Sequence, residues 1–222
     1  TVYAMITYGT CNKYGNNIRW GKRGTVSVRE EEMYTYEELR EFVVNCQRCP
    51  LASTRRRAVM GKGDPKAPVM FVPEAPGNHE DMDGVPFTGR SGELLDQLLS
   101  GAGMSREEIY LTNVVKCHPP GNRDPKPEEQ EQCMPYLKYE TWLVKPRIIV
   151  CLGRIAAQRI IRPDYRITRE HGAFVYRKNT YLTAVYHPSA VLRDMGKWEE
   201  TLRDFRAIRE KRDELPIGDK SE

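Results

Sequence analysis

The chain has 222 residues, which is enough for one α/β domain with a real core and short for two. Its 35 Lys and Arg residues against 31 Asp and Glu residues leave a net charge of +4, too mild to indicate a nucleic-acid partner by itself. No apolar run approaches the roughly 20 residues that cross a bilayer, and no secretory signal is visible. These features exclude a membrane-spanning helix and predict a cytoplasmic protein with no membrane partner.

Residues 1–32 differ from the rest of the chain. They mix Tyr, Gly, Asn and basic residues without a steady period, and they end in the acidic run Glu30, Glu31 and Glu32. We expect a poorly ordered N-terminal extension there, one globular domain over residues 33–215 and a short tail over 216–222.

Strands and helices are expected to alternate through the domain. A short amphipathic helix begins at Tyr36, and Pro135 should kink or split a later helix. Lys178 and Asn179 are expected to turn residues 173–176 back along the last strand. Apolar runs predict strands at 69–72, 110–115, 147–152 and 181–186, and helical patterns cover 92–99, 127–144, 154–161 and 203–214. This alternation predicts a three-layer α/β fold, with a mostly parallel central sheet flanked by helices.

One polar or glycine residue stands at the end of each predicted strand. Glu74 follows the first, Asn113 ends the second, Gly153 follows the third and His187 follows the fourth. Ligands of open α/β sheets bind beyond the carboxyl ends of the strands, so we expect these four segments to converge on one site.

The longest irregular stretch runs from Phe71 to Leu99. Prolines and glycines hold the chain open just after the first strand, where regular structure cannot form. Phe87 lies further along, between Pro86 and Thr88 and outside any apolar period. A carboxylate and an aromatic ring in such a loop indicate a ligand site, although a core position for Phe87 is an equal alternative.

Four of the six cysteines are candidate metal ligands. Cys46 and Cys49 form a C-x2-C pair, and Cys117 and Cys133 lie in a polar, proline-rich stretch. Four thiolates can hold zinc or an iron–sulfur cluster, and spacing alone does not choose between them. Cys151, inside a strand-like run, is interpreted as a small core residue.

Basic residues cluster between Arg48 and Lys66. This stretch contains six basic residues, including Arg55 and Arg56, and a single acidic residue, Asp64. Such a run can contact phosphates, and a merely solvated surface is an equal alternative.

Taken together, these motifs resemble the family 4 uracil-DNA glycosylases, the iron–sulfur class of bacteria and archaea. The resemblance covers about Glu38 to Arg209, and one departure is Pro73, where the family usually has Gly. The matching motifs are EAPG at 74–77, GVPFTG at 84–89, TNVVKC at 112–117, PPGNR at 119–123 and HPSAVLR at 187–193. The resemblance implies a [4Fe–4S] cluster on Cys46, Cys49, Cys117 and Cys133.

The resemblance also implies a role for each residue at the predicted site. Phe87 would stack on a flipped uracil, and Asn113 would pair with uracil O4 and N3–H, although a strand-end turn is the alternative for Asn113. His187 would donate to O2 of the leaving uracil, or be an ordinary loop residue. Glu74 would orient the attacking water or stabilise charge on the sugar, with helix capping as its alternative. Three further acidic residues that could share this role rank below it: Glu80, Asp81 and Asp83.

DNA contacts follow from the same resemblance. Leu192 would enter the DNA near the vacated base, while Arg193, Arg55 and Arg56 would contact phosphates. We expect a monomeric, monofunctional uracil-DNA glycosylase, since no Lys is placed to form a Schiff base with the sugar. The alternatives are a uracil-DNA binding protein without catalysis, a glycosylase for another deaminated base such as hypoxanthine, and a zinc-stabilised nucleic-acid module.

Overall fold

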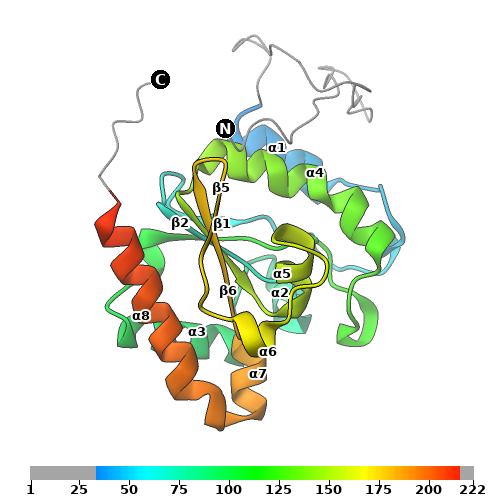
Figure 1. Ribbon diagram of the computed structural model, residues 1–222. Coiled ribbons are helices and arrows are strands. Elements are labelled where there is room, and N and C mark those ends of the chain that lie inside the picture. The colour runs from blue at the N-terminus through cyan, green and yellow to red at the C-terminus, as the bar shows by residue number, and fades with distance from the viewer. Residues whose placement is uncertain (1–33, 216–222) are drawn as a thin grey trace.

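The computed structural model describes residues 34–215, and the extension predicted over 1–32 and the tail predicted over 216–222 lie outside this range. The described chain forms one six-stranded sheet with helices on both faces (Figure 1). The predicted three-layer α/β class is therefore confirmed. No helix in this range is both long enough and apolar enough to cross a membrane.

The sheet has the order β1-β3-β2-β4-β6-β5, and its four central strands run parallel. β1 and β5 pair antiparallel at the two edges. The predicted turn before β6 is confirmed, with Lys178 and Asn179 both at positive φ, as tight hairpins require. The strands are β1 (Lys62–Gly63), β2 (Val69–Val72), β3 (Ile109–Leu111), β4 (Ile148–Leu152), β5 (Val175–Arg177) and β6 (Thr180–Val185).

Helices α1 and α4 lie side by side over one face of the sheet, and α3 and α8 cover the other (Figure 1). The helices are α1 (Tyr36–Val44), α2 (Asn78–Asp83), α3 (Arg90–Gly101), α4 (Pro127–Val144), α5 (Arg154–Ile160), α6 (Ile167–Glu170), α7 (Pro188–Arg193) and α8 (Trp198–Glu214), with 3₁₀ turns at Pro50–Ser53, Arg106–Glu108, Pro120–Asn122 and Met195–Lys197.

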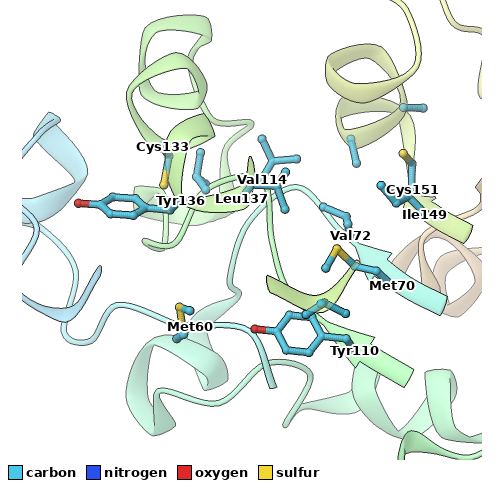
Figure 2. Packing of buried hydrophobic residues seen from close by; sticks show 14 of the residues in the cluster. Met60, Met70, Val72, Tyr110, Val114, Cys133, Tyr136, Leu137, Ile149 and Cys151 are labelled. Carbon is cyan, nitrogen blue, oxygen red and sulfur yellow. The ribbon is translucent and has the colours of Figure 1, made fainter. Parts of the chain in front are cut away.

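Strand β2 shows how the two cores arise. Met70 and Val72 pack on the side of α1 and α4 (Figure 2), whereas Val69 and Phe71 pack on the side of α3 and α8. All four side chains are fully buried, which explains the unbroken apolar run of this central parallel strand. On the second side, Phe71 stacks on Phe205 with ring centroids 5.5 Å apart.

Helix α8 buries the face predicted for it, with Leu202, Phe205 and Ile208 directed into the core. Helix α1 begins with a capping box, in which Thr35 and Glu38 each bind the other's backbone amide. Cys151 is fully buried in β4, as expected of a core residue.

Helix α4 runs unbroken from Pro127 to Val144 and contains Pro135. The predicted split at Pro135 is therefore not observed, whereas the predicted kink stays a prediction. Burial of Tyr136 and Leu137 helps to offset the roughly 3 kcal/mol that an internal proline costs. Strand β3 ends at Leu111 rather than 115, since the buried residues after it follow a loop instead of the sheet. The irregular stretch after β2 contains a helix, α2, that the sequence analysis did not predict, and the short helix α7 follows directly after His187.

Candidate active site

The ends of four parallel strands bring the predicted site residues to one edge of the sheet. β3, β2, β4 and β6 are consecutive neighbours, so Glu74, Asn113, Gly153 and His187 all lie beyond the same edge. Gly153 permits a close approach there, because a Cβ at this position would lie 3.2 Å from the Cβ of His187. The convergence predicted from the sequence is thus present in the fold.

The loop after β2 is held by the loop after β3. The carbonyl of Pro73 accepts the amide of Val114 at 2.9 Å, and the carbonyl of Glu74 accepts that of Val115 at 3.0 Å. Both bonds use carbonyls of the first loop, so the N–H that proline lacks is not required for them. Pro73 is therefore compatible with this loop geometry.

Glu74 is half-buried at the edge of the site. Burial raises the pKa of its carboxyl, and the nearby Asp124 raises it further, while Arg154 and Arg193 lower it. Asp124 and Arg154 also pair with each other at 2.7 Å. The protonation of Glu74 is therefore tuned by three charged neighbours, of which sequence reasoning identified only Arg193.

Phe87 combines burial with an unusual backbone. It is 6% exposed and has a φ of 56°, a left-handed conformation that bulky residues rarely adopt. Arg106 holds its carbonyl at 2.9 Å, and a Cβ at position 92 would lie 2.0 Å from that same oxygen, so only glycine fits there. The ring packs into the α3 and α8 core and also stacks on His187, with centroids 5.7 Å apart and planes 27° apart.

Asn113 is 2% exposed and follows β3. Its backbone carbonyl accepts from Lys116 Nζ at 2.9 Å. Among the described residues, none donates to or accepts from its side-chain amide. The amide therefore keeps one donor and one acceptor available for a ligand.

His187 occupies the N-cap of α7. Its Nδ1 accepts the backbone amide of Ser189 at 3.1 Å and lies 2.8 Å from the Ser189 hydroxyl. A ring nitrogen that accepts carries no proton, which assigns the proton of the neutral ring to Nε2. Burial, helped by Arg193, lowers the pKa of His187 to about 4, so the imidazole is neutral at physiological pH.

Two of the three acidic residues ranked below Glu74 have carboxylate contacts of their own. The buried carboxylate of Asp81 accepts the backbone amides of Arg56 and Arg57, and Glu80 accepts that of Thr88 at 3.2 Å. These bonds position α2 and the neighbouring loops. They account for both carboxylates without a role in water handling.

The four predicted metal ligands line one small cavity between α4 and the segment after α1. All are free thiols: Cys46, Cys49, Cys117 and Cys133. Across residues 34–215, no group of three or more His, Cys, Asp or Glu side chains stands close enough to hold a metal ion. The cysteines therefore share a cavity without forming a closed coordination site.

The surroundings of this cavity suit a sulfur-rich group. Arg48 lines it, and the Nη1 atom of this residue is buried without a hydrogen-bond partner among the described residues. Arg55 donates to Cys117 Sγ at 3.3 Å, and the amide of Lys116 donates to Cys133 Sγ at 3.2 Å. Burial raises the pKa of Cys117 to about 11 and that of Cys133 to about 12. Such thiols ionise only when a bound cation offsets the charge, which fits metal ligands.

The predicted DNA-contacting residues differ in exposure. Arg56 and Arg193 are exposed, and Leu192 is half-buried against Leu94 and its neighbours. Arg55 instead turns towards the cysteine cavity and also donates to the Val44 carbonyl at 2.9 Å. Its phosphate contact stays a prediction.

Sequence reasoning missed several residues that support the site. Ser189 selects the tautomer of His187, Arg106 holds Phe87, and Asp124 and Arg154 act on the carboxyl of Glu74. Ser189 lies within a quoted motif and could have been found as an N-terminal helix residue. The others act across the fold, and no local pattern marks them.

Comparison with known proteins agrees with this geometry. Residues 60–211 match the model of the uracil DNA glycosylase superfamily. The chain is 42% identical over 187 residues to the type-4 uracil-DNA glycosylase of Archaeoglobus fulgidus, covering 80% of this chain and 94% of the relative. It is 40% identical over 168 residues to that of Thermotoga maritima, covering 73% and 88% respectively. The chain belongs to the uracil DNA glycosylase superfamily and, within it, to the type-4 uracil-DNA glycosylases.

Proposed function

We propose that this protein is a monofunctional uracil-DNA glycosylase, which hydrolyses the N-glycosidic bond of uracil in DNA and so starts base excision repair. The observation that carries the proposal is the stack of Phe87 on a neutral His187, at the edge where the Asn113 amide lies without a partner among the described residues. The aromatic face of Phe87, the donor and acceptor atoms of the Asn113 amide and the neutral N–H of His187 together match uracil.

Recognition of the base rests on Phe87 and Asn113. A base must leave the helical stack before it can be cut, at a cost of a few kcal/mol. Stacking on an aromatic ring returns about 1–3 kcal/mol. The Asn113 amide donates to uracil O4 and accepts from N3–H, whereas cytosine presents the reverse pattern and is rejected by about 1–3 kcal/mol.

Bond cleavage rests on His187 and Glu74. Uracil leaves with the electron pair of the broken C1′–N1 bond, and negative charge gathers on O2. His187 Nε2–H donates to that oxygen, and because the ring is already neutral it stabilises the charge without transferring a proton. Glu74 orients the water whose oxygen bonds to C1′, or offsets positive charge on the sugar.

The monofunctional assignment is supported by the surroundings of Lys116. Its side chain is buried and its ammonium pairs with Glu140, so it is not available to attack a sugar. Water is then the nucleophile, and the product is an abasic site.

The residues that would hold a [4Fe–4S] cluster are Cys46, Cys49, Cys117 and Cys133. When bound, such a cluster would cross-link α4 to the segments that carry the other three cysteines. Arg48 and Arg55 would donate to its sulfurs, which favours the thiolate form of the ligands.

Contacts with the DNA backbone are assigned to Arg56 and Arg193, with Leu192 near the vacated base. Arg55 is a further candidate, although its guanidinium faces the cysteine cavity. We propose a monomer that acts on uracil-containing DNA.

Purified protein incubated with a labelled oligonucleotide carrying one uracil tests the proposal. Alkali-sensitive breakage at uracil, with matched thymine, cytosine and hypoxanthine strands as controls, is the expected result. Tight binding to the uracil strand with no breakage would leave a uracil-DNA binding protein instead. Faster release of hypoxanthine than of uracil would reassign the substrate.

A further inference from the structure

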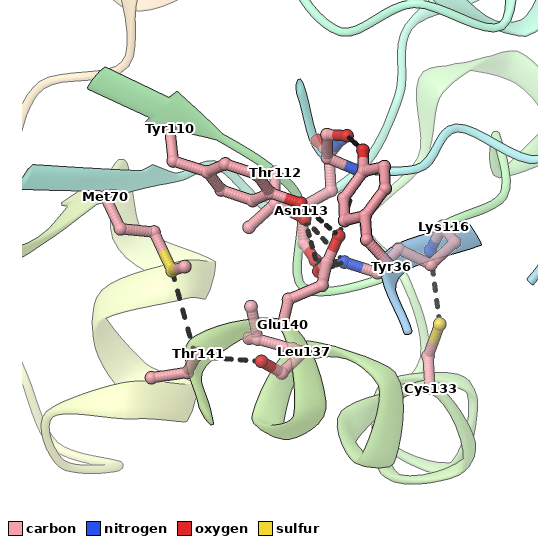
Figure 3. A network of polar contacts seen from close by, with 11 residues as sticks. Tyr36, Met70, Tyr110, Thr112, Asn113, Lys116, Cys133, Leu137, Glu140 and Thr141 are labelled. Atoms are coloured by element: carbon pink, nitrogen blue, oxygen red, sulfur yellow. Dashed lines mark hydrogen bonds and ion pairs between the residues drawn. The ribbon is translucent and has the colours of Figure 1, made fainter. Parts of the chain in front are cut away.

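A buried ion pair, formed by Lys116 and Glu140, contacts the backbone of Asn113 (Figure 3). Lys116 and Glu140 are 1% and 0% exposed, and they join the loop after β3 to the middle of α4. Lys116 is not used in the proposed chemistry. Replacing a buried ion pair by apolar side chains of similar volume is often neutral or stabilising, so stability is a weak reason for its presence.

The ammonium of Lys116 uses all three of its protons. It donates to Thr112 Oγ1 at 2.6 Å, to the Asn113 carbonyl at 2.9 Å and to the carboxylate of Glu140. Its three acceptors therefore fix the position of the ammonium between the loop after β3 and helix α4.

Glu140 anchors this arrangement to the rest of the core. It accepts the Gly61 amide at 2.9 Å, the Thr112 hydroxyl at 2.7 Å and the Tyr110 hydroxyl at 3.3 Å (Figure 3). These partners come from two separate parts of the chain, Gly61 and the end of β3, so the carboxylate cannot move without breaking several bonds at once.

The consequence for Asn113 concerns one peptide group. The Asn113 carbonyl is held by Lys116, and the Val114 amide of the same planar unit is held by the Pro73 carbonyl at 2.9 Å. Both polar atoms of the unit are therefore bonded. The direction in which the Asn113 side chain leaves the backbone depends on this double attachment.

We propose that Lys116 and Glu140 are positioning residues for uracil recognition, which hold the Asn113 amide in the orientation that pairs with the base. The inference rests on the proposed function of Asn113. Lys116 also links this role to the cysteine cavity. Its backbone amide donates to Cys133 Sγ, while its side chain donates to the Asn113 carbonyl.

The test is inhibition of uracil excision by free uracil, which probes the base pocket apart from the DNA. The double variant Lys116→Met with Glu140→Gln removes both charges together and keeps the size of each side chain. We expect free uracil to inhibit it about tenfold more weakly, and the single-turnover rate to fall by about as much, because a misplaced amide loses part of its pairing. KM for the oligonucleotide, the melting temperature and the metal content should stay near those of the unchanged protein.

Two Thr→Val changes provide a matched pair. Thr112→Val removes the hydroxyl that links Lys116 to Glu140, and we expect uracil inhibition to weaken about threefold. Thr141→Val, on the same helix as Glu140, removes a hydroxyl whose partners within residues 34–215 are Leu137 and Met70, and it should leave inhibition unchanged.

Unchanged uracil inhibition in a folded double variant would overturn the proposal. If the double variant does not fold, unchanged inhibition in Thr112→Val would overturn it equally. Failure of the unchanged protein to release uracil would instead refute the proposed function, so the two failures are distinguishable.

Discussion

The backbone amide of Ser189 donates to Nδ1 of His187 over 3.1 Å, and this hydrogen bond decides which nitrogen of the ring can donate to a ligand. Nε2 is left as the donor, in a ring that burial keeps neutral. The face of that ring stacks on Phe87. In the proposed mechanism, a donor fixed in this way loses little by reorganisation when charge develops on the departing base.

The first prediction concerns this donor. His187→Ala should lower the single-turnover rate on uracil by about 10²–10³-fold with little change in KM, because the donor acts mainly on the leaving group. His187→Gln, which keeps an N–H donor, should retain more activity than the alanine variant. Equal rates for both variants would contradict the assignment.

The second prediction concerns the pH dependence of the rate. Burial raises the pKa of Glu74, so the carboxylate that the proposed mechanism requires is present above that pKa and is lost as pH falls through it. Asp124→Asn removes a neighbour that raises this pKa and should move the acid limb of the pH–rate profile to lower pH. Arg154→Gln should move it to higher pH. The check is a single-turnover pH–rate profile for each variant. A shift of the acid limb in the same direction in both variants would contradict this electrostatic account.

The same experiment identifies the carboxyl group itself. Glu74→Gln should reduce the rate by about 10²–10⁴-fold and abolish the acid limb. A limb that persists in this variant would assign it to another group.

The third prediction concerns base choice. Asn113→Ala should weaken discrimination by about 1–3 kcal/mol, measured as slower excision of uracil and as weaker inhibition by free uracil. Its affinity for an undamaged oligonucleotide should not change, because phosphates supply that affinity. An unchanged response to free uracil would show that another group recognises the base.

The fourth prediction concerns the cysteines. Serine at Cys46, Cys49, Cys117 or Cys133 should remove the visible iron–sulfur absorbance and lower the melting temperature, since each would supply one ligand. Cys151→Ser is the control, because this thiol lies in the β4 core and should leave the absorbance intact. Elemental analysis separates iron from zinc. Zinc in the purified protein would refute the cluster assignment.

The fifth prediction concerns salt. Arg56→Ala and Arg193→Ala should each reduce the slope of log affinity against log salt by about 1, if each side chain binds one phosphate. Lys178→Asn is the control, because Lys178 lies in the hairpin turn before β6, far from the carboxyl ends of the strands, and asparagine tolerates its positive φ. A slope that changes as much in the control would show a general effect of net charge.

Local sequence was enough for most of the fold. β2 was predicted at 69–72 and α4 at 127–144, and both are observed with those bounds. Strand β3 was overextended because Val114 and Val115 are buried in a loop, and burial alone does not distinguish a loop residue from a strand residue.

The sequence by itself also determined the place of the site, since parallel strands send the residues that follow them to a single edge. Only the tertiary structure decided which contacts hold the side chains and backbone groups of those residues in place. Lys116 and Glu140 are 24 residues apart in the chain, and Arg106 reaches the Phe87 carbonyl across 19 residues. Such contacts depend on how helices and loops pack, and packing leaves no periodic pattern in the chain. The residues proposed to bind a ligand could therefore be selected from sequence motifs, whereas the residues that contact and support them became visible only in the folded protein.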